Sequence, residues 1–335
     1  MSSQASFHEG SALSGVPIRD LGLSIAGTRL EPIVEALRGE LNRAGLTRLR
    51  PRFYLSTEWG VPMGSVAIAI PFYLARPDLT ELHRKRTGHI EGSSAAEILR
   101  YLRHEAGHAV SYAYLLYEEK GFIERFGSMT QPYIEEYRPA PFCRRHVSHL
   151  PGWYAQKHPD EDWAETFAVW LTPGLDWRST YAAWPEALEK LEYCDRTIAA
   201  IRDKDPIVSS DELDEDVGEI EYSLDDYYKT QEPEGAELPA GIDGALRAIF
   251  EDLTGPGEQA SRFIRDAEPE LLASVYRFTG LFPERTRALL YHLAARADAL
   301  GLPMDRSRER EALVALTAFV TALAMNRVVS GSYLP

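Results

Sequence analysis

The chain has 335 residues, of which 44% are hydrophobic and 26% are charged, a composition typical of soluble globular proteins. At about 150 residues per domain, this length predicts about two domains. The formal net charge is −15, with 51 acidic and 36 basic residues, which argues against a nucleic-acid or anionic-membrane partner.

The N-terminal segment is the first element along the chain. Residues 1–19 contain neither the basic nor the apolar region of a signal peptide, and we expect them to be flexible. The two cysteines, Cys143 and Cys194, are too few for a disulfide framework, so the cytoplasm is the expected location. Whether they pair with each other stays open.

Residues 20–208 show a mixed pattern of helices and strands. Apolar residues at helical spacing from Leu30 to Leu41 predict an amphipathic helix. Strands are predicted at Arg52–Ser56 and over residues 66–73, with turn-forming glycines and proline between them. Ser94 and Glu97 form a capping-box pattern, which predicts the start of a long helix.

That long helix carries the sequence His104-Glu105-Ala106-Gly107-His108, an HExxH pattern. Residues four apart are separated by one helical turn, so both imidazoles can reach one metal ion. Glu105 then lies beside them, where it can take a proton from a metal-bound water. The alternative is a surface helix with two unrelated histidines. A glycine inside a helix costs up to ~1 kcal/mol relative to alanine, so we expect Gly107 to allow another backbone to approach closely.

Zinc needs a third protein ligand, which the sequence places downstream. The pattern does not continue as HExxHxxGxxH, which excludes a metzincin. Pro159 and the acidic residues after it predict a second helix, on which Glu161 and Glu165 share one face. One of these carboxylates can bind the metal while the other accepts the N–H of a ligating histidine. A solvated acidic face is the alternative for this helix, and three further residues remain alternative ligands: His158, Asp160 and Asp162.

The two helices together resemble a known family. The HEAGH sequence, Tyr154, Pro159 and the run Glu161-Asp162-Trp163-Ala164-Glu165-Thr166-Phe167 are similar to gluzincin metallopeptidases of the anthrax lethal factor-like kind, and more closely to bacterial zinc-binding metallopeptidases with a DWAET segment. The resemblance covers the two helices firmly and residues 50–200 loosely.

The resemblance implies a role for each matching residue. His104, His108 and Glu161 would bind Zn²⁺, Glu105 would be the general base, and Glu165 would orient a ligating histidine. Tyr154 would stabilise the oxyanion, and a phenol donating a hydrogen bond there contributes a few kcal/mol to lowering the barrier. A core or surface tyrosine is the alternative reading of Tyr154.

The resemblance also makes residues 66–70 a candidate edge strand for an extended peptide. A fully buried strand is the alternative, and Pro71 would end its pairing because proline has no N–H.

Cys143, His146 and His149 are spaced by threes, which is compatible with a second metal site. No fourth ligand lies nearby, and the adjacent arginines 144 and 145 would repel a cation. We therefore expect His146 and His149 to contact the substrate instead.

Residues 209–240 carry twelve acidic residues and one lysine, so most of the negative charge lies in this segment. Its composition predicts an acidic linker, although Tyr222, Leu224, Tyr227 and Tyr228 could dock on a neighbouring surface. Beyond it, helical patterns over 242–253, 271–278, 285–300 and 310–328 predict a helical domain of unknown role, which could bind a protein partner. The apolar run 312–325 has 14 residues, shorter than the ~18 needed to cross a bilayer, and predicts a buried core helix.

The sequence therefore predicts an α+β zincin-like metallopeptidase domain over residues 20–208, followed by the linker and an all-α domain over 241–335. We expect zinc-dependent hydrolysis of a peptide or protein substrate by Glu105-activated water. A non-catalytic zinc-binding regulatory protein and a zinc hydrolase of a non-peptide amide are the alternatives. Cleavage specificity, the choice between endo- and exopeptidase action, and the oligomeric state stay open.

Overall fold

The computed structural model describes residues 15–87, 90–134, 137–230, 241–250 and 258–333. The described residues divide into two units, one formed by 15–83 and 90–230, the other by 84–87 and the residues after 240. Each unit has its own hydrophobic core, which is the property expected of a separate domain.

The chain up to residue 230 contains eight helices and two strands among its described residues. The helices are α2 (Leu30–Arg43), α3 (Pro77–Thr87), α4 (Ala95–Tyr114), α5 (Lys120–Phe126), α6 (Pro159–Leu171), α7 (Trp177–Thr180), α8 (Pro185–Ile201) and α9 (Leu224–Thr230). The strands are β1 (Arg52–Ser56) and β2 (Ala67–Pro71), and short 3₁₀ turns lie at Ile18–Leu21, Phe72–Ala75, Leu116–Glu118 and Tyr154–Gln156.

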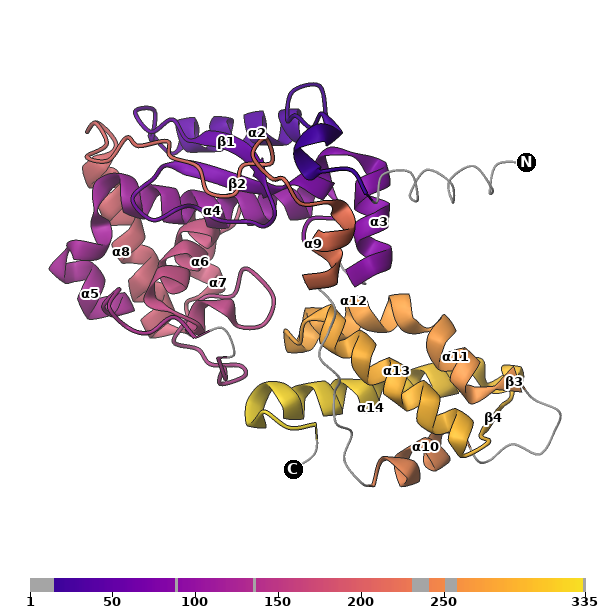
Figure 1. Cartoon of the computed structure of the whole chain (residues 1–335). Coiled ribbons are helices and arrows are strands. Elements are labelled where there is room, and N and C mark those ends of the chain that lie inside the picture. Colours follow the sequence, from indigo (N-terminus) through magenta and orange to yellow (C-terminus); the bar gives the residue numbers. More distant parts are fainter. Residues whose placement is uncertain (1–14, 88–89, 135–136, 231–240, 251–257, 334–335) are drawn as a thin grey trace. The chain divides into compact units, whose positions relative to one another are not determined.

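Helix α4 lies at the centre of the first unit, between the sheet with α2 and helix α6 (Figure 1). The predicted capping box is confirmed: Ser94 accepts from the backbone of Glu97, and the Glu97 carboxylate accepts from the backbone of Ser94. The apolar face predicted for α2 is also confirmed, since Leu30, Leu37 and the other apolar residues at that spacing are buried. The buried apolar faces of α2 and α4 thus pack against each other in the core of the first unit.

Strand β2 pairs with β1 in parallel and is buried along its whole length. On its other side, the backbone N–H of Ala69 donates to the carbonyl of Gly60 at 2.8 Å. Pairing ends at Pro71, as predicted. The burial and the contact with Gly60 favour the fully buried strand over an edge strand that accepts a peptide.

The described part of the predicted acidic linker, residues 209–230, packs against the first unit instead of connecting two domains. The N–H of Val66 donates to Ser210 at 2.8 Å, and the N–H of Val217 donates to Leu55 at 3.0 Å. Leu224 and four other apolar residues of this segment are buried in the first core: Val217, Ile220, Tyr227 and Tyr228. These side chains bury enough apolar surface to hold the acidic backbone in place, while residues 231–240 lie outside the described residues.

Residues 15–19 belong to the N-terminal segment that was predicted to be flexible, but they too pack against the first unit. Ile18 is 1% exposed, and its backbone N–H donates to Tyr222 at 3.1 Å. The neighbouring Arg19 N–H donates to Ile220 at 3.1 Å. Residues 15–19 are therefore tied to the acidic segment, while 1–14 lie outside the described residues.

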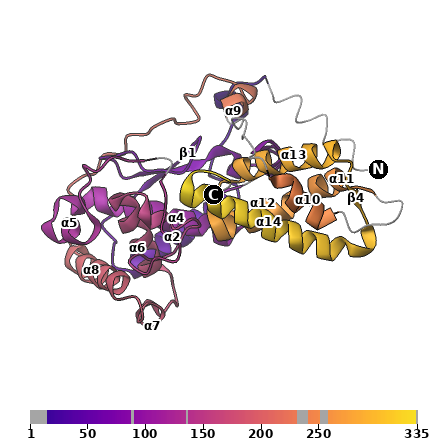
Figure 2. The same ribbon diagram turned by 90° about the horizontal axis from the view of Figure 1, so that it is seen from below.

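The second unit consists of helices around a separate core (Figure 2). Its elements are α10 (Ile242–Phe250), β3 (Glu258–Gln259), α11 (Ala260–Asp266), α12 (Glu268–Thr279), α13 (Pro283–Ala299), β4 (Pro303–Met304), a 3₁₀ turn (Arg306–Arg308) and α14 (Glu309–Ser330). The two short strands pair in antiparallel fashion.

Helix α14 differs from the buried core helix predicted over 312–325. The helix has 22 residues. Together with the turn that precedes it, the segment Arg306–Ser330 is long and apolar enough to cross a membrane, judged by length and composition alone. Only 28% of its most apolar stretch is buried. The buried face includes Leu316, Val320 and Leu323 and packs into the core of the second unit. Contacts within the unit therefore explain the apolar residues on this side of the helix.

Candidate metal centre

Helices α4 and α6 approach each other at Gly107. A Cβ atom on Gly107 would lie 2.7 Å from the Cα of Ala164, closer than real Cβ contacts come. The indole N–H of Trp163 also donates to the carbonyl of Gly107 at 2.8 Å. The close backbone approach predicted from this glycine is confirmed, and α4 packs directly against α6 (Figure 1).

His104, His108 and Glu161 bring one ligand atom each to a common point, and we call these three residues the ligand cluster. Their ligand atoms lie within 4.8 Å of one another, and all three residues are buried. Nε2 of His104 is 3.0 Å from Oε2 of Glu161 and 3.1 Å from Nε2 of His108. Nε2 of His108 is 3.3 Å from the same Glu161 oxygen.

This donor set fits a metal ion. Two imidazole nitrogens and one carboxylate oxygen are the three protein ligands of many catalytic zinc sites, which keep a fourth position for water or substrate. In the described part of the chain, no other group of three or more histidines, cysteines or acidic residues brings its ligand atoms together in this way. The cluster is therefore able to hold a metal, and its chemistry favours zinc.

The histidines and carboxylates of the cluster shift one another's pKa values. Burial disfavours the charged imidazole of His104, but hydrogen bonds to Glu161 and Glu165 outweigh it and raise the pKa of His104 to about 9. The pKa of the Glu161 carboxyl is held well below its ordinary value: burial opposes this, and the two histidines outweigh it. The carboxylate thus stays charged at neutral pH, which a metal ligand requires.

Each histidine of the cluster has a carboxylate at its other ring nitrogen. Nδ1 of His104 donates to Oε1 of Glu165 at 3.0 Å, and Glu165 is fully buried. Nδ1 of His108 lies 3.1 Å from Oδ2 of Asp160. Such partners fix the ring orientation and leave Nε2 to face the metal.

The two orienting carboxylates are themselves held in place. The second oxygen of Glu165 accepts the backbone N–H groups of His149 at 2.9 Å and Leu150 at 2.8 Å. Oδ2 of Asp160 accepts the hydroxyl of Tyr112 at 2.5 Å. From the sequence, Asp160 was considered only as an alternative ligand. The one feature that could have indicated its orienting role is Tyr112, which lies one turn beyond His108 on the same helix and donates to Asp160.

Glu105 and Tyr154, the two residues predicted to take part in catalysis, lie beside the cluster. Glu105 is 5% exposed, and burial raises the pKa of its carboxyl, an effect partly opposed by the charges of His104 and His108. The ring of Tyr154 lies 5.6 Å from that of His104, measured between centroids. Burial, the charge of Glu161 and the neighbouring Tyr133 raise the pKa of the Tyr154 phenol well above its ordinary value, so it remains a hydrogen-bond donor.

Tyr133 is a residue that sequence reasoning missed. Its hydroxyl donates to Oε1 of Glu161 at 2.6 Å. No motif surrounds it, and it lies 28 residues before its partner in a segment without regular structure. Nothing in the spacing of the sequence could have identified this contact.

The other histidines near the cluster are engaged elsewhere. Nδ1 of His158 accepts the N–H of Asp160 at 3.2 Å, and Nε2 donates to the carbonyl of Gln131 at 3.1 Å. Because both of its nitrogens have partners, the structure does not support His158 as a ligand.

His146 and His149, the predicted substrate contacts, lie outside the ligand cluster. The imidazole of His149 donates to the carbonyl of Arg100 at 3.0 Å. His146 lies between Sγ of Cys143, at 3.8 Å from Nδ1, and Oδ2 of Asp162, at 3.7 Å from Nε2. The Cys143–His146–His149 spacing therefore does not gather into a second metal site. Both cysteines are free.

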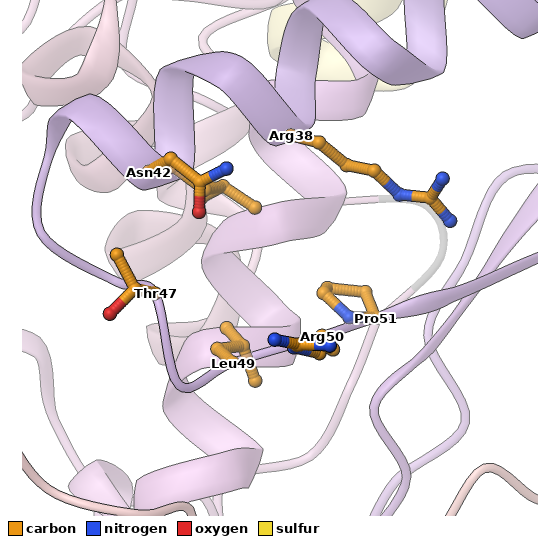
Figure 3. Close-up of a pocket in the computed structure, with 7 residues that line it drawn as sticks. Arg38, Asn42, Thr47, Leu49, Arg50 and Pro51 are labelled. Atoms are coloured by element: carbon orange, nitrogen blue, oxygen red, sulfur yellow. The ribbon is translucent and has the colours of Figure 1, made fainter.

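A separate pocket of about 390 Å³ lies between α2 and the segment that precedes β1 (Figure 3). Arg38 and Asn42 come from the helix, and Thr47, Leu49 and Arg50 come from the following segment. The pocket shares no residue with the ligand cluster.

Comparison with known proteins finds no curated protein and no solved structure that matches the chain. Residues 63–209 match the model of a family described as "Putative zinc-binding metallo-peptidase". The matched residues include both α4 and α6, and hence the whole ligand cluster with its orienting carboxylates. The family match and the buried cluster together support a zinc metallopeptidase.

Proposed function

We propose that this protein is a zinc-dependent peptidase of the gluzincin type, in which His104, His108 and Glu161 bind one Zn²⁺ ion. The observation that carries the proposal is the convergence of these three ligand atoms within 4.8 Å on the two packed helices of the matched segment. The arrangement of two helices beside a small sheet is compatible with a zincin-like domain, and we extend the proposal to that fold class.

The bound zinc would supply a Lewis acid that polarises the scissile carbonyl and lowers the pKa of water. Glu105 takes the proton from the attacking water on its carboxylate and then gives it to the leaving amine. The carboxyl is buried, and burial raises its pKa, which favours a group that both accepts and donates a proton. Hydrolysis then consumes one water and releases a carboxylate and an amine.

Tyr154 donates its phenol hydrogen to the oxygen that becomes negative as water attacks. Its raised pKa supports this role because the hydroxyl keeps its proton. Glu165 accepts the Nδ1–H of His104, and Asp160 lies 3.1 Å from Nδ1 of His108, so that a carboxylate beside each ring orients its Nε2 atom. The substrate in this proposal is a peptide or protein, and contact of His146 or His149 with it stays a prediction.

The test compares the full-length zinc protein with its Glu105→Gln variant on a diverse peptide library. We expect the variant to retain stoichiometric zinc while cleavage falls by about 100- to 10,000-fold, the usual contribution of a general base. Glu161→Ala serves as the second variant and should lose zinc. Wild-type protein that holds zinc but cleaves no peptide would refute peptidase function and favour a non-catalytic zinc-binding protein, whereas a fully active Glu105→Gln variant would refute the mechanism.

A further inference from the structure

The segment between α5 and α6 is attached to the start of α6 through His158. One nitrogen of its imidazole accepts the N–H of Asp160, which caps the helix, and the other donates to the carbonyl of Gln131. A neutral imidazole has one acceptor and one donor, so both contacts are satisfied at once. The chain at residue 131 is thereby attached to His158, three residues before Glu161 in the sequence.

Tyr133 follows two residues later and is placed by contacts on two sides. Its ring lies 5.3 Å from the ring of His158, measured between centroids. The ammonium group of Lys157 lies over the same ring at 4.3 Å from its centroid, a distance at which cation–π attraction contributes. Tyr133 as a whole residue is 47% exposed, yet its hydroxyl reaches the buried carboxylate of Glu161.

The two oxygens of Glu161 consequently have different partners. Oε1 accepts the Tyr133 hydroxyl at 2.6 Å, a length typical of a charge-assisted O–H···O⁻ bond. Oε2 faces both imidazoles, at 3.0 Å from His104 and 3.3 Å from His108. The terminal torsion of a glutamate is broad and weakly restrained, so this hydrogen bond fixes which oxygen faces the histidines.

We propose that Tyr133 is a positioning residue of the metal site: by holding Oε1 of Glu161, it makes the carboxylate offer only Oε2 to the metal. The proposal rests on the metal-binding part of the proposed function. A carboxylate that offers both oxygens occupies two coordination positions, whereas a catalytic zinc site needs one position for water or substrate. Tyr133 thus keeps a position available without touching the metal itself.

The test is Tyr133→Phe in the full-length protein, with Tyr137→Phe as the matched control. The Phe variant keeps the ring and its contacts and removes only the hydroxyl. Tyr137 is a nearby tyrosine whose hydroxyl donates at 2.7 Å to a backbone carbonyl, that of Gly152, and not to a ligand. Zinc affinity is measured by competition with a chromophoric chelator, and the visible absorption spectrum is recorded after Co²⁺ is bound.

We expect Tyr133→Phe to bind zinc about 10- to 100-fold more weakly, as is usual when the partner of a ligand is removed. Its Co²⁺ spectrum should also change, because the freed oxygen alters the coordination. Tyr137→Phe should match wild type in both measurements. Wild-type affinity together with a wild-type Co²⁺ spectrum in Tyr133→Phe would overturn the inference.

The two proposals fail in different ways. If the wild-type protein binds zinc but cleaves no peptide, peptidase function fails, and the affinity and spectrum still decide the role of Tyr133. If the protein cleaves peptides and Tyr133→Phe is unchanged, only the positioning role fails. If the wild-type protein binds neither zinc nor Co²⁺, both proposals fail.

Discussion

Gly107 lies where the backbones of α4 and α6 approach each other closely, and Gly107→Ala tests whether this contact sets the geometry of the metal site. The new methyl group would lie 2.7 Å from the Cα of Ala164 and 3.1 Å from its carbonyl oxygen. Both are backbone atoms, so no side-chain rotation can relieve the overlap. The two helices must move apart, and Glu161 moves with α6.

The expected magnitude follows from two opposing effects. Alanine is better than glycine inside a helix by about 1 kcal/mol, while forcing an extra methyl group into a packed core costs about 1–3 kcal/mol. Because the clash here is with backbone, the upper part of that range applies, and we expect a net loss of about 1–2 kcal/mol. In a unit of about 200 residues this lowers the unfolding temperature by roughly 2–8 °C.

Tryptophan fluorescence provides the assay, because all six tryptophans lie between residues 59 and 184 and therefore report on the first unit alone. Thermal and urea unfolding of the metal-free full-length protein give the stability, and chelator competition gives the zinc affinity. Gly39→Ala is the matched control, since Gly39 lies within α2 and its new Cβ would meet only the end of the Arg43 side chain, at 3.3 Å.

Gly39→Ala should be neutral or up to about 1 kcal/mol more stable than wild type. Gly107→Ala should be less stable and should bind zinc more weakly, since Glu161 is displaced from the two histidines. Equal or greater stability of Gly107→Ala, with unchanged zinc affinity, would refute the argument that the close approach of α4 and α6 builds the site.

Three further predictions concern the metal and its supports. Glu165→Gln should weaken zinc binding about 10- to 100-fold, because an amide cannot accept from His104 and from two backbone N–H groups together; unchanged affinity in chelator competition would contradict this. Lys190→Met leaves the buried Asp162 without its 2.6 Å partner and should cost about 3–5 kcal/mol in urea unfolding, with partial recovery in the Lys190→Met/Asp162→Asn double variant. Removing zinc with a chelator should lower the unfolding temperature reported by tryptophan and abolish cleavage, and adding zinc back should restore both, because the ion binds the folded state; equal unfolding temperatures with and without zinc would exclude a bound ion at this site.

The chemistry-bearing helices could be predicted from the sequence because their signals are local. The capping box, the HExxH spacing and the proline followed by acidic residues are each contained within one helical turn or two. Gly107 added a non-local inference, since a glycine inside a helix needs a reason such as the close approach of another backbone, and the structure shows that approach. The sequence thereby indicated both helices and the fact of their contact, but not which residues of α6 would face each histidine.

The acidic segment shows where composition misleads. Its net charge suggested a solvated connector, yet Val217, Ile220 and Leu224 are buried in the core of the first unit. The acidic side chains between them, such as Glu219 and Glu221, are exposed. A count of charges averages over both faces of a segment, so a few well-placed apolar residues outweigh it in the folded state.

The contacts that complete the metal site come from the segment between α5 and α6, which has no periodic pattern to read. The hydroxyl of Tyr133 donates to Oε1 of Glu161, and the backbone N–H groups of residues 149 and 150 donate to Oε2 of Glu165. The two carboxylates lie one turn apart on α6, so their orientations are set independently from opposite ends of one irregular segment. It follows that substitutions in this segment can change the geometry of the metal site although all three ligands and the HExxH motif stay the same. We expect such substitutions to change the affinity for zinc.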